Sequence, residues 1–294
     1  FEIGAVDYIT KPFSPPVVMQ RVKLHLELEE VHKKVEALNR QYSSYISPHL
    51  AKSIRDGEIT ASVGSSRKKL TVFFSDIQNF TAGTEKLEPE DMTFLLNHYF
   101  DVMTRIVHKY NGTLDKYIGD AMLVFFGDPE SRGIREDAET CISMAIEMQE
   151  AIKAMQEVWH SKGITMPLQV RMGITTGFCT VGNFGSSTQL AYTIMGTPVN
   201  LASRLQSHAR PGVLMISEET YQLVKDRFEC VAQPPVQVKG LSYAVQAYEI
   251  ISAAKGNIYN VWTDHCHIRV DFDSLSDTER SDIKAFLSEL NEKM

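Results

Sequence analysis

The sequence contains few cysteines, no long apolar run and no excess of positive charge. Its four cysteines are scattered without a CxxC pair, which argues against a zinc site or disulfide framework and favours a reducing, cytoplasmic compartment. No apolar run approaches the roughly 18 residues that span a bilayer, and no signal peptide is visible, so we expect no membrane span. The net charge of −7 argues against a general nucleic-acid-binding protein, although it does not exclude a nucleotide substrate.

The chain divides into segments of different character. Its 294 residues suffice for one large domain with appendages, or for two domains, and a hydrophobic content of 43% is typical of a globular core. We expect an N-terminal fragment at residues 1–30, a helical linker overlapping it at 15–46, a polar linker at 47–69, a catalytic domain at 70–252 and an extension of unknown role at 253–294.

A long helix is predicted over residues 15–46, because apolar residues recur there every seven positions. The two series, offset by four, are Val17, Leu24, Val31 and Leu38, and then Leu28, Val35 and Tyr42, with Arg21 as a polar interruption. This is the a/d pattern of a coiled coil, and valine at a with leucine at d favours two parallel strands. We therefore expect a homodimer. An amphipathic helix packed on its own domain is the alternative.

Residues 70–252 alternate short apolar strands with amphipathic helices. Strands are expected at 70–75, 167–175, 189–194, 228–233, 236–239 and 245–251, with helices from Glu88 to about Gly112 and over 135–161. The order strand, helix, hairpin, helix predicts an α+β sandwich with a mostly antiparallel sheet and flanking helices.

The stretch KYIGDAMLVFFG places Asp120 at the tip of a predicted hairpin, and Asp76 follows the apolar strand 70–75. A Gly-Asp dipeptide is by itself an ordinary turn signal, but one strand end, one helix and one strand separate the two acids, which can bring them to the same end of neighbouring strands. Two such carboxylates repel unless a cation neutralises them, and Mg²⁺ suits two carboxylates plus phosphate oxygens. The turn that follows, including Phe80 and Thr81, offers backbone N–H groups for a polyphosphate.

Three motifs, FFSDIQNFT, KYIGDAM and GTPVNLASRL, resemble in order and spacing the catalytic domain of the class III nucleotidyl cyclases. The resemblance implies two Mg²⁺ or Mn²⁺ ions and a dimer whose sites lie across the interface, with metal ligands from one chain and the remaining residues from its partner. The residues it implies are the metal ligands Asp76, Asp120 and the Ile77 carbonyl, the base-recognition pair Lys116 and Thr193, the catalytic pair Asn200 and Arg204, and the triphosphate-binding Lys239.

The base-recognition pair favours ATP. Lysine only donates hydrogen bonds, so Lys116 suits the N1 acceptor of adenine, and the Thr193 hydroxyl can accept from the 6-amino group. Because that hydroxyl can also donate, discrimination is expected to depend mainly on Lys116. Adenylyl members of the family often carry Lys with Asp and guanylyl members Glu with Cys; a Lys and Thr pair resembles a branch that bicarbonate stimulates.

The segment GAVDYITKPF resembles the last strand of response-regulator receiver domains, with Lys11 at the phosphate-sensing position and a Lys11–Pro12 bond that is typically cis there. The chain begins at Phe1 without the earlier strands or a phosphorylatable aspartate, and we expect it to be part of a longer protein. A simple strand and turn is the alternative. In a two-component arrangement, an upstream receiver would act through the coiled coil on the geometry of the paired catalytic domains.

The sequence therefore predicts a homodimeric adenylyl cyclase that converts ATP to cyclic AMP and pyrophosphate. A guanylyl cyclase and a catalytically inactive dimerisation module are the alternatives. A diguanylate cyclase is disfavoured because the hairpin lacks the glycine-acid-acid-Phe signature of that family.

Overall fold

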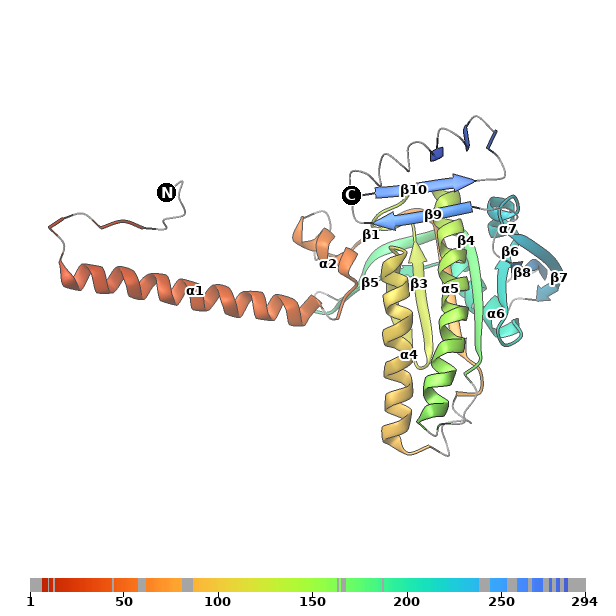
Figure 1. Cartoon of the computed structure of the whole chain (residues 1–294), viewed down its shortest axis with the longest axis horizontal. Coiled ribbons are helices and arrows are strands. Elements are labelled where there is room, and N and C mark those ends of the chain that lie inside the picture. Colours follow the sequence, from red (N-terminus) through yellow and green to blue (C-terminus); the bar gives the residue numbers. More distant parts are fainter. Residues whose placement is uncertain are drawn as a thin grey trace.

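The structure is a computed structural model of the 294-residue chain. It describes residues 7–9, 11–12, 14–43, 45–57, 62–80, 87–162, 164, 168–186, 188–237, 244–252, 258–263, 266–271, 275–276, 279–280 and 283–284. Figure 1 shows a long N-terminal helix extending from a body of sheet and helices.

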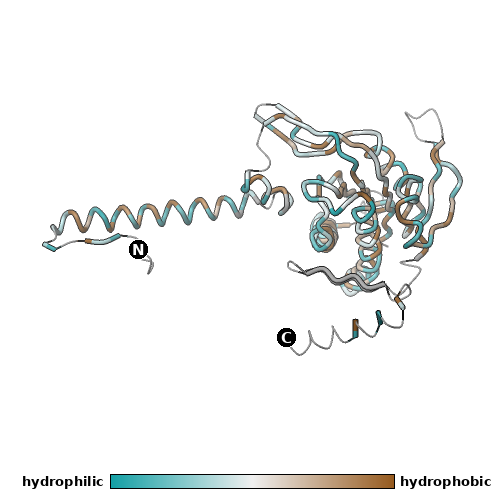
Figure 2. The backbone as a smooth tube through the Cα atoms, turned by 90° about the horizontal axis from the view of Figure 1, so that it is seen from above, coloured by the Kyte–Doolittle hydropathy of each residue, from teal (hydrophilic) through white to brown (hydrophobic). Residues whose placement is uncertain are grey.

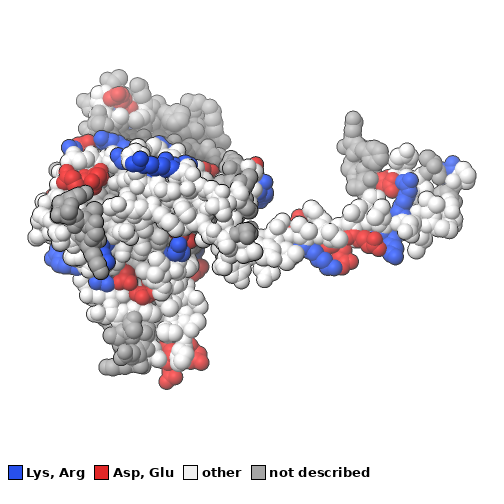
Figure 3. Space-filling view, turned by 180° about the vertical axis from the view of Figure 1, so that it is seen from behind, with Lys and Arg blue, Asp and Glu red and all other residues white. Residues whose placement is uncertain are grey.

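The long helix is α1 (Pro15–Ser43), which confirms the expected helix. The apolar residues of its two heptad series are between 48% and 65% exposed, so this face does not pack on the chain's own domain. Apolar residues recur along its whole length in Figure 2, and Figure 3 shows its charges in mixed acidic and basic groups. Some of these charges form i,i+4 pairs, such as Glu29 with Lys33 at 2.6 Å. Pairing of two such helices stays a prediction.

The segments flanking α1 differ from expectation. Residues 7–9 are not part of a strand, and the rest of the strand expected near the N-terminus lies outside the described residues. The Lys11–Pro12 bond is cis. The expected linker at 47–69 contains a helix, α2 (Pro48–Arg55), because Ser47 caps its N-terminus by accepting from Leu50 N–H at 3.3 Å.

The main sheet has the strand order β2-β3-β1-β4-β6-β8-β7, with β5 paired to β4. Neighbouring strands are antiparallel except β4 and β6, so the expected mostly antiparallel sheet is confirmed. The strands are β1 (Gly64–Ile77), β2 (Thr113–Ile118), β3 (Ala121–Phe126), β4 (Val170–Gly185), β5 (Leu190–Met195), β6 (Leu214–Ser217), β7 (Glu229–Gln237) and β8 (Ala244–Ser252).

Four of the expected strands differ in extent from those in the structure. Within the described residues, the two strands expected at 228–233 and from 236 onward form one strand, β7, whose register shifts between Gln233 and Val236; residues 238–239 lie outside the described part. Pro234 and Pro235 lie at that shift and cannot donate to the ladder, which made the sequence resemble two strands. β1 begins six residues before the expected Leu70, and β4 extends beyond 175, because the two strands pair along their whole length.

Two long helices, α4 (Pro89–Lys109) and α5 (Ile134–Ser161), cover one face of the sheet (Figure 1). Side chains alternate along β1, so that Phe73 and Ile77 join the core beneath these helices, whereas Val72 and Phe74 face the opposite side. The shorter helix α6 (Thr197–His208) packs on that opposite side. It approaches β4 so closely that a Cβ at Gly173 would lie 2.4 Å from the Ala202 carbonyl oxygen, which requires glycine there.

The remaining elements lie towards the C-terminus. They are α7 (Glu218–Val224) and a hairpin of β9 (Ile258–Thr263) and β10 (Cys266–Asp271) that the sequence did not predict. Ser276 and Glu279 form a capping box: Ser276 N–H donates to Glu279 Oε2 at 2.9 Å, and Glu279 N–H donates to Ser276 Oγ at 3.4 Å. Within the described residues, no helix is both long and apolar enough to cross a membrane.

Candidate active site

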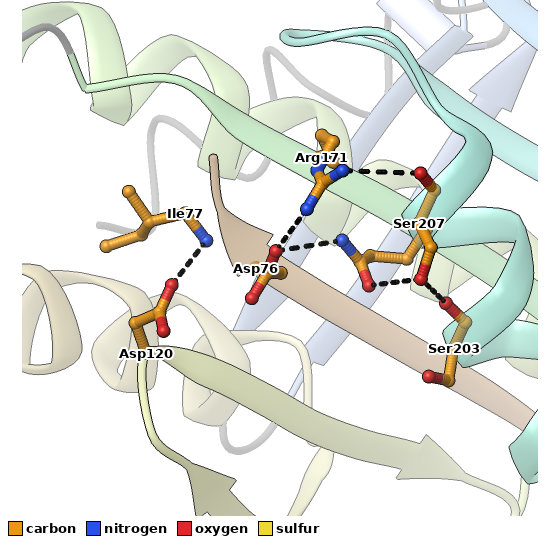
Figure 4. Close-up of polar contacts among 7 residues, drawn as sticks. Asp76, Ile77, Asp120, Arg171, Ser203 and Ser207 are labelled. Carbon is orange, nitrogen blue, oxygen red and sulfur yellow. Dashed lines mark hydrogen bonds and ion pairs between the residues drawn. The ribbon is translucent and has the colours of Figure 1, made fainter. Parts of the chain in front are cut away.

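Asp76 and Asp120 lie together at one end of two neighbouring strands. Asp76 is near the end of β1, and Asp120 directly precedes β3, after a turn in which Gly119 has a φ of +65°. Since β1 and β3 are antiparallel neighbours, the end of one adjoins the start of the other. Ile77 N–H donates to Asp120 Oδ2 at 3.1 Å, which ties the hairpin to β1 (Figure 4). The expected juxtaposition is therefore present.

The two carboxylates interact unfavourably with each other. Burial, followed by the charge of Asp76, raises the pKa of Asp120 above its ordinary value near 3.8. The same two charges contribute, after burial, to raising the pKa of Tyr99, whose hydroxyl lies 3.3 Å from Ser75 Oγ behind the site. This end of the sheet therefore favours a cation beside the acids.

A cationic side chain already lies beside Asp76. Arg171 on β4 sits directly opposite Asp76 in the strand register, and its Nη2 donates to Asp76 Oδ2 at 2.6 Å. The Gln206 side-chain amide of α6 donates to the same oxygen at 3.2 Å, and Arg171 also donates to the Ser207 carbonyl at 3.2 Å (Figure 4). Sequence reasoning missed Arg171, whose only signal was its position in a strand paired with β1.

The donor set at this end of the sheet suits a hard divalent cation. Two carboxylates and a nearby carbonyl match Mg²⁺, which takes one or two carboxylates and completes its octahedron with water and substrate phosphates. The repulsion between Asp76 and Asp120 and the guanidinium already at Asp76 both fit this reading. Within the described parts of the chain, no cluster of three or more His, Cys, Asp or Glu could hold a metal without such additional ligands.

The turn after β1 only partly matches the expected phosphate cradle. One N–H group of this turn, that of Gln78, donates to the Gln169 carbonyl at 2.7 Å and is therefore not free for a phosphate. The side chain of Phe80 is buried in the core under α4 and α5. Thr81 and Lys239, both expected to contact substrate, lie outside the described residues.

Lys116 and Thr193 are joined by an aspartate that the sequence reading did not single out. Asp115 lies at a register shift in β2, and its side chain is only 1% exposed. Its Oδ2 accepts from Thr193 Oγ1 at 2.6 Å and from Ile194 N–H at 3.2 Å, while Lys116 Nζ lies 3.3 Å from Oδ1. The structure thus brings the two predicted base-recognition residues to one carboxylate.

Asn200 and Arg204 share one face of α6, because they lie four residues apart in that helix. Both are exposed, whereas Leu201 and Leu205 of the same helix are buried. Within the described residues, neither side chain is hydrogen-bonded to Asp76 or Asp120. The pair therefore faces outward from the chain that carries it.

The comparisons with known proteins agree with this site. Residues 63–252 match the family described as "Adenylate and Guanylate cyclase catalytic domain". "Adenylate cyclase 1" of Rhizobium meliloti is 28% identical over 191 residues, which cover 64% of this chain and 28% of that protein. "Adenylate cyclase" of Anabaena cylindrica is 28% identical over 257 residues, or 85% of this chain and 48% of that protein. The chain thus spans less than half of either relative.

Two solved structures extend the similarity. The adenylyl cyclase CyaB from P. aeruginosa is 49% identical, with a TM-score of 0.64 over 66% of this chain and 98% of that one. The guanylyl cyclase Cya2 is 33% identical, with a TM-score of 0.62 over 66% of this chain and 96% of that one. With the family match covering most of the chain and the acids placed as described, this protein belongs to the adenylate and guanylate cyclase catalytic domain family.

Proposed function

We propose that this protein is an adenylyl cyclase that converts ATP to 3′,5′-cyclic AMP and pyrophosphate. The 3′-oxygen of the ribose attacks the α-phosphorus, the bond from that phosphorus to the bridging oxygen breaks, and pyrophosphate leaves as the hydroxyl proton passes to a base. The observation that carries the proposal is the convergence of Asp76 and Asp120 at one end of the sheet. It is supported by the similarity to an adenylyl cyclase of 49% identity.

Asp76, Asp120 and the Ile77 carbonyl would hold two Mg²⁺ or Mn²⁺ ions. When bound, these ions supply charge neutralisation at the triphosphate and lower the pKa of the attacking hydroxyl. Arg171 is well placed to change partners, because its Nε is buried without a hydrogen-bond partner in the described structure. We expect its guanidinium to exchange Asp76 for the triphosphate, which accepts a bidentate fork. Lys239, with the turn at Phe80 and Thr81, would contact the same phosphates.

Asn200 and Arg204 would act on the nucleotide held by a second copy of the chain. Their exposed positions on α6 suit contact with a partner rather than with their own Asp76. Asn200 would orient the ribose, and Arg204 would stabilise the charge that grows on the reacting phosphate. Parallel pairing of α1 through its exposed apolar series would hold two chains together in the cytoplasm.

The choice of ATP depends on Lys116 and Thr193. A lysine ammonium only donates, and therefore suits the N1 acceptor of adenine and opposes the N1–H of guanine. The similarity to a guanylyl cyclase of 33% identity makes GTP the second candidate substrate. Two kinds of regulation belong to the same proposal. Activation by bicarbonate is supported by the family resemblance at Thr193, and control by an upstream receiver is supported by the resemblance at Lys11.

The test is an assay of the purified chain with ATP or GTP and Mg²⁺ or Mn²⁺, in which cyclic product and pyrophosphate are both measured. We expect cyclic AMP and pyrophosphate in equal amounts, with ATP preferred over GTP, and no product from Asp76→Ala. A preference for GTP would establish the guanylyl alternative. Metal-dependent nucleotide binding without product would establish the inactive dimerisation module. A parallel series with added bicarbonate tests its effect on rate.

A further inference from the structure

Asp115 removes an ambiguity in the proposed base-recognition pair. A threonine hydroxyl can donate or accept, so Thr193 alone does not discriminate an amino group from a carbonyl oxygen at position 6 of a purine. In the structure the Thr193 hydroxyl donates to Asp115 Oδ2 at 2.6 Å. Its single hydrogen is therefore committed to that bond, and the oxygen has only lone pairs left to offer a ligand.

The surroundings of Asp115 hold it in this role. Its side chain is 1% exposed and Thr193 is 5% exposed, so water competes poorly for their hydrogen bond. Ile194 N–H donates to the same Oδ2 at 3.2 Å, which fixes the carboxylate from the backbone of β5. Lys116 Nζ lies 3.3 Å from Oδ1, which has no hydrogen-bond partner within the described structure, so the charges of Asp115 and Lys116 face each other.

We infer that Asp115 is a positioning residue for purine specificity, which sets Thr193 as an obligate acceptor and holds Lys116 as the neighbouring donor. The pair then presents a donor for N1 and an acceptor for the 6-amino group, which is the pattern complementary to adenine. Guanine places a donor opposite Lys116 and an acceptor opposite Thr193, so that both contacts are mispaired. The inference rests on the proposed function, because it concerns the base of that substrate.

The unmodified chain provides one test, with two ATP analogues of similar size. The 6-ethylpurine and 6-methoxypurine riboside triphosphates both keep N1 as an acceptor and differ at position 6 by one acceptor oxygen. An acceptor-only hydroxyl at Thr193 opposes that oxygen, so we expect kcat/KM for the methoxy analogue to be lower by about 5-fold or more. Pyrophosphate release measures both reactions independently of the base. Equal rates, or faster turnover of the methoxy analogue, would overturn the inference.

Variants at position 115 provide the second test. Asp115→Leu removes the acceptor, so the Thr193 hydroxyl can turn its hydrogen towards the base, and we expect the ethyl-to-methoxy ratio of kcat/KM to fall to about one or below. Asp115→Asn keeps an amide oxygen that can accept from Thr193 and Ile194, and we expect it to retain the wild-type ratio even if kcat/KM falls for every nucleotide. A merely structural role would lower all rates and leave the ratio unchanged in both variants.

The outcomes separate this inference from the proposed function. No cyclic product from ATP in the unmodified chain would refute the proposed function itself. Normal cyclic AMP formation with no discrimination between the two analogues would refute only the role of Asp115. If Asp115→Leu does not fold, the analogue pair in the unmodified chain still decides the question.

Discussion

Asp76 and Arg171 face each other across the antiparallel strands β1 and β4, and the guanidinium donates to the carboxylate at 2.6 Å. A side-chain cation thus occupies the carboxylate that the proposed metal ions need. If Asp76 binds metal as proposed, the metal ions and Arg171 would compete for the same carboxylate.

Replacing Arg171 by methionine, which keeps an unbranched but shorter side chain and removes the charge, tests this competition. Without nucleotide, we expect Mn²⁺ to bind Arg171→Met a few-fold more tightly than the unmodified chain, because one competing cation is gone. With ATP we expect KM to rise, since the guanidinium no longer reaches the triphosphate. Calorimetric titration and steady-state kinetics measure the two effects. Arg210→Met, which removes the Arg210–Glu249 ion pair, is the matched control. Unchanged Mn²⁺ affinity in Arg171→Met would contradict the competition.

Asp120→Asn should separate activity from stability. The amide oxygen can still accept from Ile77 N–H, but the charge is lost, so we expect turnover to fall by roughly 100-fold or more. Because the folded pKa of Asp120 is raised, its charge destabilises the folded chain at neutral pH, and that cost disappears as pH falls through the folded pKa. In EDTA we therefore expect Asp120→Asn to raise Tm at pH 7.

The same thermal measurement, repeated at lower pH, tests whether the charge of Asp120 causes the gain in Tm. The gain in Tm should shrink towards pH 4 and vanish below the ordinary aspartate pKa, where the carboxyl group is protonated in both states. The exposed Asp226, which pairs with Arg135 at 3.3 Å, provides a control in Asp226→Asn, for which we expect no gain. A gain for Asp120→Asn that does not change with pH would contradict the charge argument.

Mixing two inactive variants tests whether each site is built from two chains. Co-expressed Asp76→Ala and Arg204→Ala chains form heterodimers in which one site carries both defects and the other carries none. Random pairing should therefore restore roughly one quarter of wild-type activity. Co-expressed Asp76→Ala and Asp120→Ala chains should restore nothing, because every heterodimer site then lacks one acid. Recovery in this control, or none in the test pair with heterodimers verified, would contradict the composite site.

The exposed heptad series of α1 predicts that pairing depends on particular apolar positions. Leu28, at a d position, and Leu26, between the series, are 55% and 61% exposed in the single chain. Leu28→Lys should weaken dimerisation by about 100-fold or more, because two copies of the leucine lose their burial. Leu26→Lys should leave it nearly unchanged. Sedimentation equilibrium measures the dimer constant, and specific activity should recover in Leu28→Lys at high protein concentration. Equal effects of both variants would exclude the predicted register.

Local signals were sufficient for much of the fold. The 3.6-residue period predicted α4 and α5 with ends close to those observed, and the Gly119-Asp120 turn predicted the hairpin of β2 and β3. The sequence was less informative where pairing between strands determines how far a strand extends. The extension of β1 to Gly64 depends on pairing with β4, and the prolines at 234–235 interrupted a pattern that belongs to one strand.

Some residues of the candidate site could likewise be predicted from local sequence signals, whereas others could not. Asp76 and Asp120 each follow or precede an apolar strand, so their convergence could be argued from chain order. Arg171 and Asp115 have no such signal: the first is identified by its cross-strand partner, and the second by a register shift that turns its side chain inward towards Thr193. Both depend on which residues lie opposite each other, a property of the assembled sheet.

The two faces of α6 have a consequence for a dimer. On its inner side the Gln206 amide donates to the chain's own Asp76, and on its outer side the exposed Arg204 would contact the other subunit of the proposed dimer. Because α6 packs closely on Gly173, the helix can shift only as a rigid unit, so that its two faces move together. Nucleotide binding at one site of the proposed dimer would therefore affect the other site, and we expect the rate to depend cooperatively on nucleotide concentration.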